Sequence, residues 1–470
     1  MWRVTACGLF LASLPLLPGT VERTAPEVDP YRLKGYPTYV RQCAPCHGEH
    51  GDGAGAGARF LQPPPRDFRR TPLKWASTDN GVASIDDIRR SVVEGVGGTA
   101  MIPFRHLGEA ACNDLADVVA AFRARGTRES LTEAGLSGDD LERTVAARTV
   151  SGVRIAAPPV ESLDAEAVAR GYIAYHRRGC AACHGPDARG GDHETEVDGR
   201  RVRTRIPDLT SGLLRRSRAP DDLAARIRTG IPGTAMPATP MPDTELADLV
   251  RWLRERIPET TPNFSTPWSG TLPALRFDGV LPTSPDDPRF DAAPQTWLPL
   301  APFDAFHHPT RGVRVAALAS ATHVVLRILV PDASRDPVDG GPPDGVAVRA
   351  TPAPKPPVLP FPGQMPVLDR AVTYTGPMPR ARDPIFDASG FENPEEVCRT
   401  IAPAARTGDS VYASGLWRHV IALRTEQSGT PLGPTPLSIA VAVFDGGARK
   451  GPLPTAFTAW MELVVAPEVR

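Results

Sequence analysis

Hydrophobic and polar positions divide the chain into regions with different periodicities. An apolar run covers Val4 to Leu17. Two later stretches, Leu115 to Phe122 and Leu246 to Trp252, repeat apolar residues at helical spacing. From about Asn263, short runs of Val, Ile and Leu alternate with Gly, Pro and Asp, which is typical of strands joined by turns. The pattern therefore predicts helical units first and a strand-rich region after them.

The first apolar run has the features of an export signal. Arg3 precedes it, and the small or polar residues Gly19 and Thr20 follow it. It is shorter than the roughly 20 residues that a membrane-spanning helix needs. We expect residues 1–25 to be a signal peptide and the mature protein to be periplasmic. Because no A-x-A cleavage site is evident, an uncleaved N-terminal anchor stays open as the only membrane contact.

The strongest chemical signal is a cysteine motif that occurs twice. The copies are Cys43-Ala44-Pro45-Cys46-His47 and Cys180-Ala181-Ala182-Cys183-His184. Two thiols one helical turn apart can add to the two vinyl groups of one haem, and the adjacent histidine can then bind the iron. A zinc site would need four ligands in a compact set, and a redox pair would not need the histidine. We therefore predict two covalent haem c groups, attached at Cys43 and Cys46 and at Cys180 and Cys183, with His47 and His184 as iron ligands.

A methionine follows each motif at a matching place. Gly98-Thr99-Ala100-Met101 and Gly233-Thr234-Ala235-Met236 are identical, and the methionines lie 54 and 52 residues after the motif histidines. A thioether is a soft ligand that raises the potential of haem iron. We predict Met101 and Met236 as the second axial ligands. Core packing is the alternative for both, and Met241 competes with Met236.

The repeat extends beyond the motifs. Gly35 and Tyr39 precede the first motif as Gly171 and Tyr175 precede the second, and an amphipathic helix ends each unit. Each unit resembles a class I cytochrome c. The resemblance implies three main helices around one covalent haem, with a glycine and an aromatic residue of the first helix packed against the last helix.

Composition bounds the rest of the architecture. The 470 residues suggest two or three domains, and 53 prolines with 42 glycines exclude a mainly helical bundle or coiled coil. A hydrophobic content of 41% excludes wholesale disorder, and a net charge of -1 gives no case for nucleic-acid binding. We expect two all-α cytochrome c domains at 26–126 and 163–260, a linker at 127–162 with one short helix, and an all-β antiparallel sandwich at 261–470.

The strand-rich region carries phrases of a second family. Its strand candidates are 313–318, 324–330, 345–348, 417–423, 437–444 and 460–465. The phrases Asp344-Gly345-Val346-Ala347-Val348 and Gly415-Leu416-Trp417-Arg418-His419 resemble the haem-b-binding gamma-subunit family of ethylbenzene dehydrogenase. That resemblance implies one non-covalent haem b, bound by a methionine and a lysine.

Two residues fall on the ligand positions of that family. Met365 matches the methionine, and Lys450 is the only lysine near the matching stretch. Met365 could instead pack in a core, and Lys450 could be exposed in a turn. The alternative ligands are Met378, His307, His308, His323 and His419. The sandwich could also have lost its haem and kept only a docking role.

The chain shows no hydrolase, nucleotide or nucleophile motif. A haem with two protein ligands transfers electrons more readily than it binds substrate. We expect an electron-transfer protein that docks on the molybdopterin and iron-sulfur subunits of a dimethyl sulfoxide reductase-class complex and passes electrons to a soluble cytochrome or quinol-side carrier. The alternatives are a dihaem enzyme of the peroxidase or thiosulfate-oxidising type, and a free periplasmic shuttle. Cys112 and Cys398 could form an interdomain disulfide or remain buried thiols.

Overall fold

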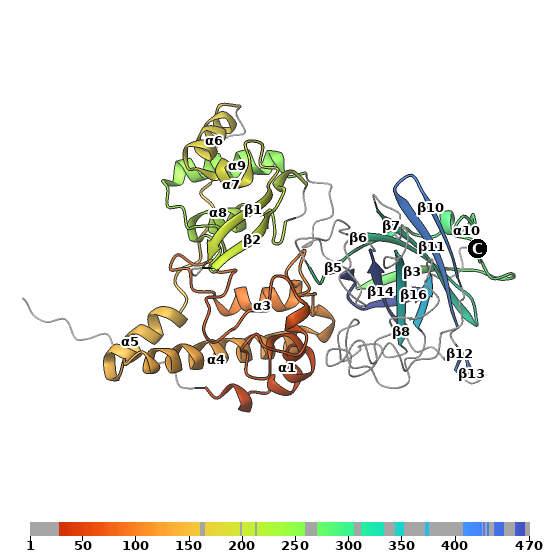
Figure 1. The fold of residues 1–470 in the computed structure, drawn as a ribbon, viewed down its shortest axis with the longest axis horizontal. Helices are drawn as coiled ribbons and strands as arrows, with labels where there is room; N and C mark the ends of the chain where they lie inside the picture. The colour runs from red at the N-terminus through yellow and green to blue at the C-terminus, as the bar shows by residue number, and fades with distance from the viewer. Residues whose placement is uncertain are drawn as a thin grey trace, which may run out of the picture.

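The computed structural model describes residues 28–159, 165–197, 200–211, 214–258, 270–304, 312–332, 344–351, 372–375, 408–424, 426–427, 430–431, 437–445 and 456–465. Two helical units and a sheet domain follow one another along the chain (Figure 1). None of the helices described is long and apolar enough to cross a membrane. The predicted signal peptide lies outside the described residues.

The first helical unit is built around two crossing helices. Its elements are η1 (Pro30–Arg32), α1 (Tyr36–Gln42), α2 (Ala44–His47), η2 (Ala58–Phe60), α3 (Ile85–Glu94), η3 (Arg105–Leu107) and α4 (Glu109–Glu133). Ser84 and Asp87 form a capping box that begins α3, and Gly95 ends it at φ 68°. Apolar residues of α1, α3 and α4 share one core that surrounds the first cysteine motif.

The predicted linker is largely helical. Helix α4 continues to Glu133, beyond the boundary expected at residue 126, and α5 (Gly138–Thr149) packs against it. Arg128 of α4 and Glu142 of α5 form an ion pair across this contact. The one short helix expected here is therefore present, and it extends the first unit.

The second helical unit repeats the first with one insertion. Its elements are α6 (Ala165–Arg177), α7 (Cys180–His184), β1 (Gly191–Val197), β2 (Arg200–Ile206), η4 (Leu209–Ser211), α8 (Pro220–Thr229) and α9 (Asp243–Arg256). Strands β1 and β2 form an antiparallel hairpin, so the expectation of an all-α unit is wrong at this place. The sequence signal was an Asp198-Gly199 dipeptide between two polar segments, which favours a tight hairpin turn.

The C-terminal region contains a sheet with one short helix, α10 (Arg289–Ala292). Its strands are β3 (Thr271–Arg276), β4 (Thr296–Pro299), β5 (Ala301–Pro302), β6 (Gly312–Ala319), β7 (His323–Pro331), β8 (Gly345–Thr351), β9 (Val372–Thr375), β10 (Gly408–Ala413), β11 (Leu416–Arg424), β12 (Glu426–Gln427), β13 (Thr430–Pro431), β14 (Leu437–Phe444), β15 (Ala456–Phe457) and β16 (Met461–Val465). All six predicted strand segments are strands.

Within the described residues, twelve of these strands form one hydrogen-bonded sheet, and β12 pairs with β13 separately. The order is β10-β11-β7-β6-β3-β16-β14-β15-β5; β4 pairs with β6, and β8 joins β14 to β9. The sheet is mixed and not wholly antiparallel, because β3 runs parallel to both β6 and β16. The 277–311 connection leaves enough chain for such a parallel return, which local turn signals do not reveal.

Strand β14 joins the sheet core to the first helical unit. Ile439, Val441 and Val443 point into the sheet core, whereas Ala440 and Ala442 belong to the core that surrounds the first cysteine motif. Both faces of the strand are buried, which explains its nearly continuous apolar sequence. The sheet domain therefore packs directly on the first helical unit.

Candidate haem sites

Each cysteine motif forms a short helix that ends at a glycine with positive φ. Gly48 and Gly185 have φ values of 74° and 75°, which a residue with a side chain rarely adopts. The hydroxyl of Tyr39 donates to the Gly48 carbonyl at 2.8 Å, and that of Tyr175 donates to the Gly185 carbonyl at 2.6 Å. The predicted aromatic residue of the first helix thus holds the end of the motif in both units.

The two predicted helix crossings have the same close contact. A Cβ atom at Gly35 would lie 2.3 Å from the Asp114 carbonyl oxygen, and one at Gly171 would lie 2.1 Å from that of Asp248. Only glycine allows the backbones to approach this closely without a shift of the helices. In each unit the first and last helices can therefore cross at close distance next to the cysteine motif.

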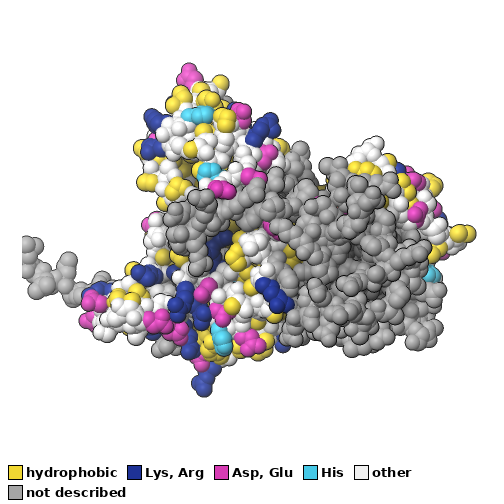
Figure 2. All heavy atoms as spheres, in the orientation of Figure 1, with side chains coloured by type: hydrophobic (Ala, Val, Ile, Leu, Met, Phe, Trp, Pro, Cys, Tyr) yellow, Lys and Arg dark blue, Asp and Glu magenta, His cyan; other side chains and the backbone are white. Residues whose placement is uncertain are grey.

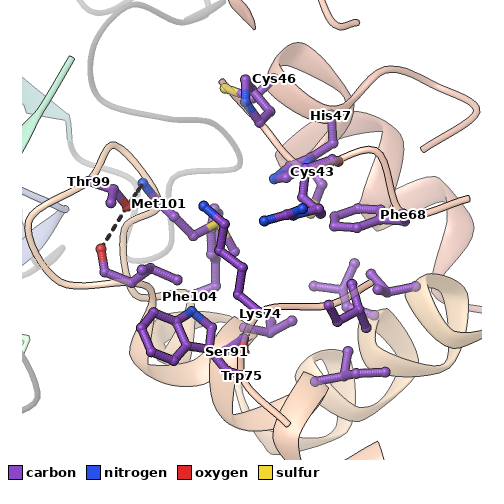
Figure 3. A pocket seen from close by; sticks show the side chains of 18 of the residues that line it. Cys43, Cys46, His47, Phe68, Lys74, Trp75, Ser91, Thr99, Met101 and Phe104 are labelled. Carbon is purple, nitrogen blue, oxygen red and sulfur yellow. Dashed lines mark hydrogen bonds between the residues drawn. The ribbon is translucent and has the colours of Figure 1, made fainter. Parts of the chain in front are cut away.

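The first unit contains a cavity that brings its predicted ligands together. Cys43, Cys46, His47 and Met101 all line it. In the close-up of Figure 3, Met101 lies on one side of this space and the two cysteines and His47 on the other. The remaining walls are mostly apolar and come from α1, α3, α4 and the loop before α3.

The hydrogen bond of His47 decides which ring nitrogen can bind a metal. Its Nδ1 lies 3.1 Å from the Arg66 carbonyl oxygen, which can only accept, so Nδ1 carries the hydrogen. Nε2 is left with its lone pair, as a histidine ligand requires. Burial lowers the pKa of His47 to about 4, so the ring is neutral at pH 7. Phe68 stacks on the ring with centroids 4.4 Å apart.

Both methionines end loops with the same internal hydrogen bonds. The Val96 N–H donates to the Met101 carbonyl at 2.8 Å, and the Ile231 N–H donates to the Met236 carbonyl at 3.0 Å. The hydroxyls of Thr99 and Thr234 each accept from the methionine N–H at 3.2 Å. The structure therefore gives the two predicted methionines equivalent places.

The second unit departs from the first around its histidine. The His184 ring is partly buried, which lowers its pKa, and its Nδ1 has no hydrogen-bond partner among the residues that the structure describes. His193 of the inserted hairpin places Nε2 3.9 Å from the Cys183 Sγ. Met241 packs against the core of the second unit, whereas Met236 lies in the loop. Met236 stays the predicted ligand because its loop has the same internal hydrogen bonds as the Met101 loop.

The predicted haem b ligands cannot be placed. Met365, Lys450, Met378, His307 and His308 lie outside the described residues. Of the other two candidates, His323 begins β7 and its Nδ1 lies 2.9 Å from the Thr322 hydroxyl.

His419 lies inside the sheet domain. It is buried on β11, stacks on Trp417, and has Nδ1 2.8 Å from the Ser410 hydroxyl. Burial lowers its pKa to about 3, so the ring is neutral at pH 7.

Three buried carboxylates of the sheet domain form a cluster that sequence reasoning missed. Oxygen atoms of Asp332, Asp344 and Asp445 lie within 4.8 Å of one another, and the Trp417 Nε1 donates to Asp344 at 3.1 Å. Carboxylate oxygens are the ligands that hard divalent cations prefer. These residues are far apart in the sequence, so no local spacing signals their approach.

Cys112 lies in the core of the first unit. Its thiol donates to the Phe104 carbonyl at 3.4 Å, and burial raises its pKa. Cys398 lies outside the described residues, so a disulfide between the two stays a prediction.

The family comparison bears on both helical units. Residues 32–120 and 166–253 match the family model for cytochrome c oxidase, cbb3-type, subunit III. Both segments are cytochrome c domains. The two matches leave more than half of the chain, including the sheet domain, outside the family model. A cytochrome c domain implies covalently bound haem c and a role in electron transfer.

Similar solved structures offer only weak likeness. A reducing HAO-like protein complex from Kuenenia stuttgartiensis has 25% identity and a TM-score of 0.39, over 48% of this chain and 96% of that chain. A family 9 carbohydrate-binding module from Caldicellulosiruptor kristjanssonii, in complex with glucose, has 9% identity and a TM-score of 0.27, over 42% and 96%. The same kind of module with cellotriose has 9% identity and a TM-score of 0.28, over 42% and 94%. These TM-scores are too low to indicate a shared fold, and no curated protein matches the chain.

The residues of the first cytochrome c domain fit a covalent haem. Two thiols and a neutral imidazole with a free Nε2 lie across an apolar cavity from a thioether. Burial raises the pKa of both thiols to about 12, so they are uncharged in this environment. When bound, the haem would supply the iron that is oxidised and reduced. The chain would hold the ring, fix its axial ligands and keep water away from the iron.

Proposed function

We propose that the protein is an exported electron-transfer protein with two covalent haem c groups. Haem 1 is attached at Cys43 and Cys46, and haem 2 at Cys180 and Cys183. The axial pairs are His47 with Met101 and His184 with Met236. The repeated geometry of motif, glycine contact and methionine loop is the observation that carries this proposal. Its counting test is a pyridine haemochrome assay on the mature protein, with two covalent haems per chain expected.

The packing of the sheet domain suggests an order of electron transfer. The loop that ends at Met101 lies against Leu300, Ala301 and Ala459 of the sheet domain. No residue from 95 to 104 is exposed, whereas Gly233, Thr234 and Pro237 of the second loop are exposed. Haem 1 would therefore exchange electrons with a redox group bound to the sheet domain, and haem 2 would exchange them with a carrier in solution.

The partner is the more specific part of the proposal. The sheet domain would dock on the molybdopterin and iron-sulfur subunits of a dimethyl sulfoxide reductase-class complex, and haem 2 would serve a respiratory carrier. A haem b bound by Met365 and Lys450 would connect the two. Resemblance to the ethylbenzene dehydrogenase gamma family supports this step. Native purification should recover both subunits, and acid-acetone should extract one haem beyond the two covalent ones.

Carbon monoxide separates electron transfer from catalysis. If both irons have two protein ligands, the reduced protein should show little change on exposure to carbon monoxide. A rapid and large Soret shift at one haem would instead support the dihaem-enzyme alternative. Recovery of the native protein without molybdopterin and iron-sulfur subunits would support the free shuttle.

A further inference from the structure

The wall of the haem 1 cavity includes a positively charged contact between the two cytochrome c domains. Arg66, Lys74 and Trp75 line the cavity and belong to the first domain. Arg216 and Arg226 of the second domain place their guanidinium groups 5.2 and 5.4 Å from the centre of the Trp75 ring. We call these five residues the cationic seam. Lys and Arg side chains are visible in the hollow between the two helical units in Figure 2.

The second domain holds the lysine segment in position. The Arg226 guanidinium donates to the Lys74 carbonyl at 3.2 Å and to the Ala76 carbonyl. Arg66 reaches in the other direction, because a Cβ atom at Gly233 of the Met236 loop would lie 2.8 Å from its Nη1. The seam therefore connects the haem 1 cavity to the loop that carries the proposed ligand of haem 2.

Lys74 is the unsatisfied charge of this seam. Its ammonium group has no hydrogen bond or ion pair with any residue that the structure describes. Burial, and then the like charges of Arg66 and Arg215, lower its pKa to about 7. A partly buried cation among other cations is costly unless an anion accompanies it.

The nearby carboxylates already have other partners. Asp87 accepts from the Ser77 and Ser84 N–H groups at 2.9 and 3.0 Å. Asp222 accepts both Arg90 donors at 2.7 and 2.9 Å, and Glu94 pairs with Arg90 at 3.0 Å. The anion that Lys74 lacks must therefore come from outside these side chains.

The direction of the side chain shows where that anion would lie. In Figure 3, Lys74 and Trp75 lie at the end of the view opposite Cys46, and the Lys74 side chain points into the cavity. A haem attached through its vinyl groups at Cys43 and Cys46 has its two propionate carboxylates on the opposite edge of the ring. Those carboxylates would face the cationic seam.

We propose that Arg66 and Lys74 bind the propionates of haem 1, and that the second domain positions them there. This assignment rests on the proposed haem function and adds two anchoring residues that the motifs do not contain. It makes the potential of haem 1 depend on a surface that both domains build. A cation beside the ring favours the ferrous state, because reduction adds a negative charge.

The test is a redox titration of the full-length mature protein, with each haem assigned by comparison with a Cys180→Ser/Cys183→Ser variant. Lys74→Gln should lower the midpoint potential of haem 1 by the equivalent of about a tenfold change in the ferric-to-ferrous ratio, or ~59 mV for a one-electron couple. Haem 2 should not change. Lys74→Arg keeps the charge and should restore the potential. Lys34→Gln is the control, because Lys34 is 81% exposed and pairs with Asp114 on the surface.

The possible outcomes are distinct. An unchanged haem 1 potential in Lys74→Gln, or an equal shift of both haems, would overturn the propionate assignment and leave the haem function intact. The absence of covalent haem in the wild-type protein would instead overturn the proposed function itself. If Lys74→Gln fails to mature, Lys74→Met provides the neutral variant of similar length.

Discussion

At the residue scale, the ligand geometry depends on a backbone group more than on a side chain. The Arg66 carbonyl fixes the ring of His47 through Nδ1, and any residue at position 66 would supply that carbonyl. The Arg66 side chain is not needed for this hydrogen bond and lines the haem 1 cavity as part of the cationic seam. In the second domain Pro207 stands at the matching position, and His184 Nδ1 has no hydrogen-bond partner among the described residues, so the two histidines are held differently.

Met101 offers the most direct residue-scale test. Met101→Ala should keep the covalent haem, since the thioether bonds do not involve this residue, but should open the sixth position of one iron. We expect the reduced variant to bind carbon monoxide at one of its two haems, and the haem 1 potential to fall. Met241→Ala is the matched control and should leave the sixth position of both irons occupied, so that neither haem binds carbon monoxide. Carbon monoxide binding by the wild-type protein at the same haem would contradict the assignment.

The cysteine motifs, the methionine loops and the glycines at the helix crossings could be predicted from the sequence. Each depends only on residue types and their spacing within one repeated unit. Lys74 and Trp75 were not. Their role arises from contacts with Arg216 and Arg226, more than 140 residues later in the chain. Nothing in the local sequence around Lys74 indicates that a second domain covers it.

At the element scale, each cytochrome c domain is stabilised by one close helix crossing. The helices are α1 and α4 in the first domain and α6 and α9 in the second. Gly171→Ala would place a Cβ 2.1 Å from the Asp248 carbonyl oxygen, so the helices must separate. We expect a loss of about 1–3 kcal/mol in the free energy of unfolding, as for other overpacked contacts. Denaturant unfolding followed by far-UV circular dichroism would measure it. The exposed Arg41→Ala change on α1 is the control, and equal stability of both variants would argue against the contact.

The same pair of helices has a pH-dependent link. Hydrogen bonds from Arg178, which directly follows α6, and from Arg177 at the end of α6 lower the pKa of Glu245 on α9 to about 2, against a usual value of 4.5. Because the folded pKa is depressed, the stabilisation is complete above about pH 4.5 and is lost as the pH falls toward 2. Glu245→Gln should thus be less stable than the wild type at pH 7, and the difference should disappear by about pH 2. Urea unfolding at several pH values would show this, and a pH-independent difference would exclude the linkage.

Strands were easier to predict than their pairing. Short runs rich in Val, Ile and Leu located β6, β7, β11 and β14 within one residue at each end. The parallel placement of β3 depends on the long 277–311 connection, and no turn signal encodes it. The 191–206 hairpin was missed because its residues are polar and form no apolar alternation.

At the scale of the whole molecule, the two cytochrome c domains form one electrostatic unit. Arg90 and Asp222 join α3 to α8 in a bidentate pair, and Arg226 holds the Lys74 segment. Arg226→Gln changes only the second domain, yet we expect it to lower the haem 1 potential, because the anchoring segment would lose its support. The same titration that tests Lys74 would measure it. Arg254→Gln, a charge change at an exposed position of α9, is the control, and a shift confined to haem 2 would contradict the expectation.

The contact between the sheet domain and the Met101 loop can be tested from the sheet side. Ala459 is 3% exposed and lies against that loop. An arginine at this position would be too large for the space and would place a charge in a buried contact. Ala459→Arg should displace the sheet domain and loosen the Met101 loop while leaving the haem attachment intact. We expect carbon monoxide to bind reduced haem 1 at least tenfold faster than in the wild type, with haem 2 unchanged. Val280→Arg, at an 84% exposed position of the same domain, should behave as the wild type. If Ala459→Arg leaves carbon monoxide binding unchanged although the sheet domain has separated, the sheet domain does not protect haem 1.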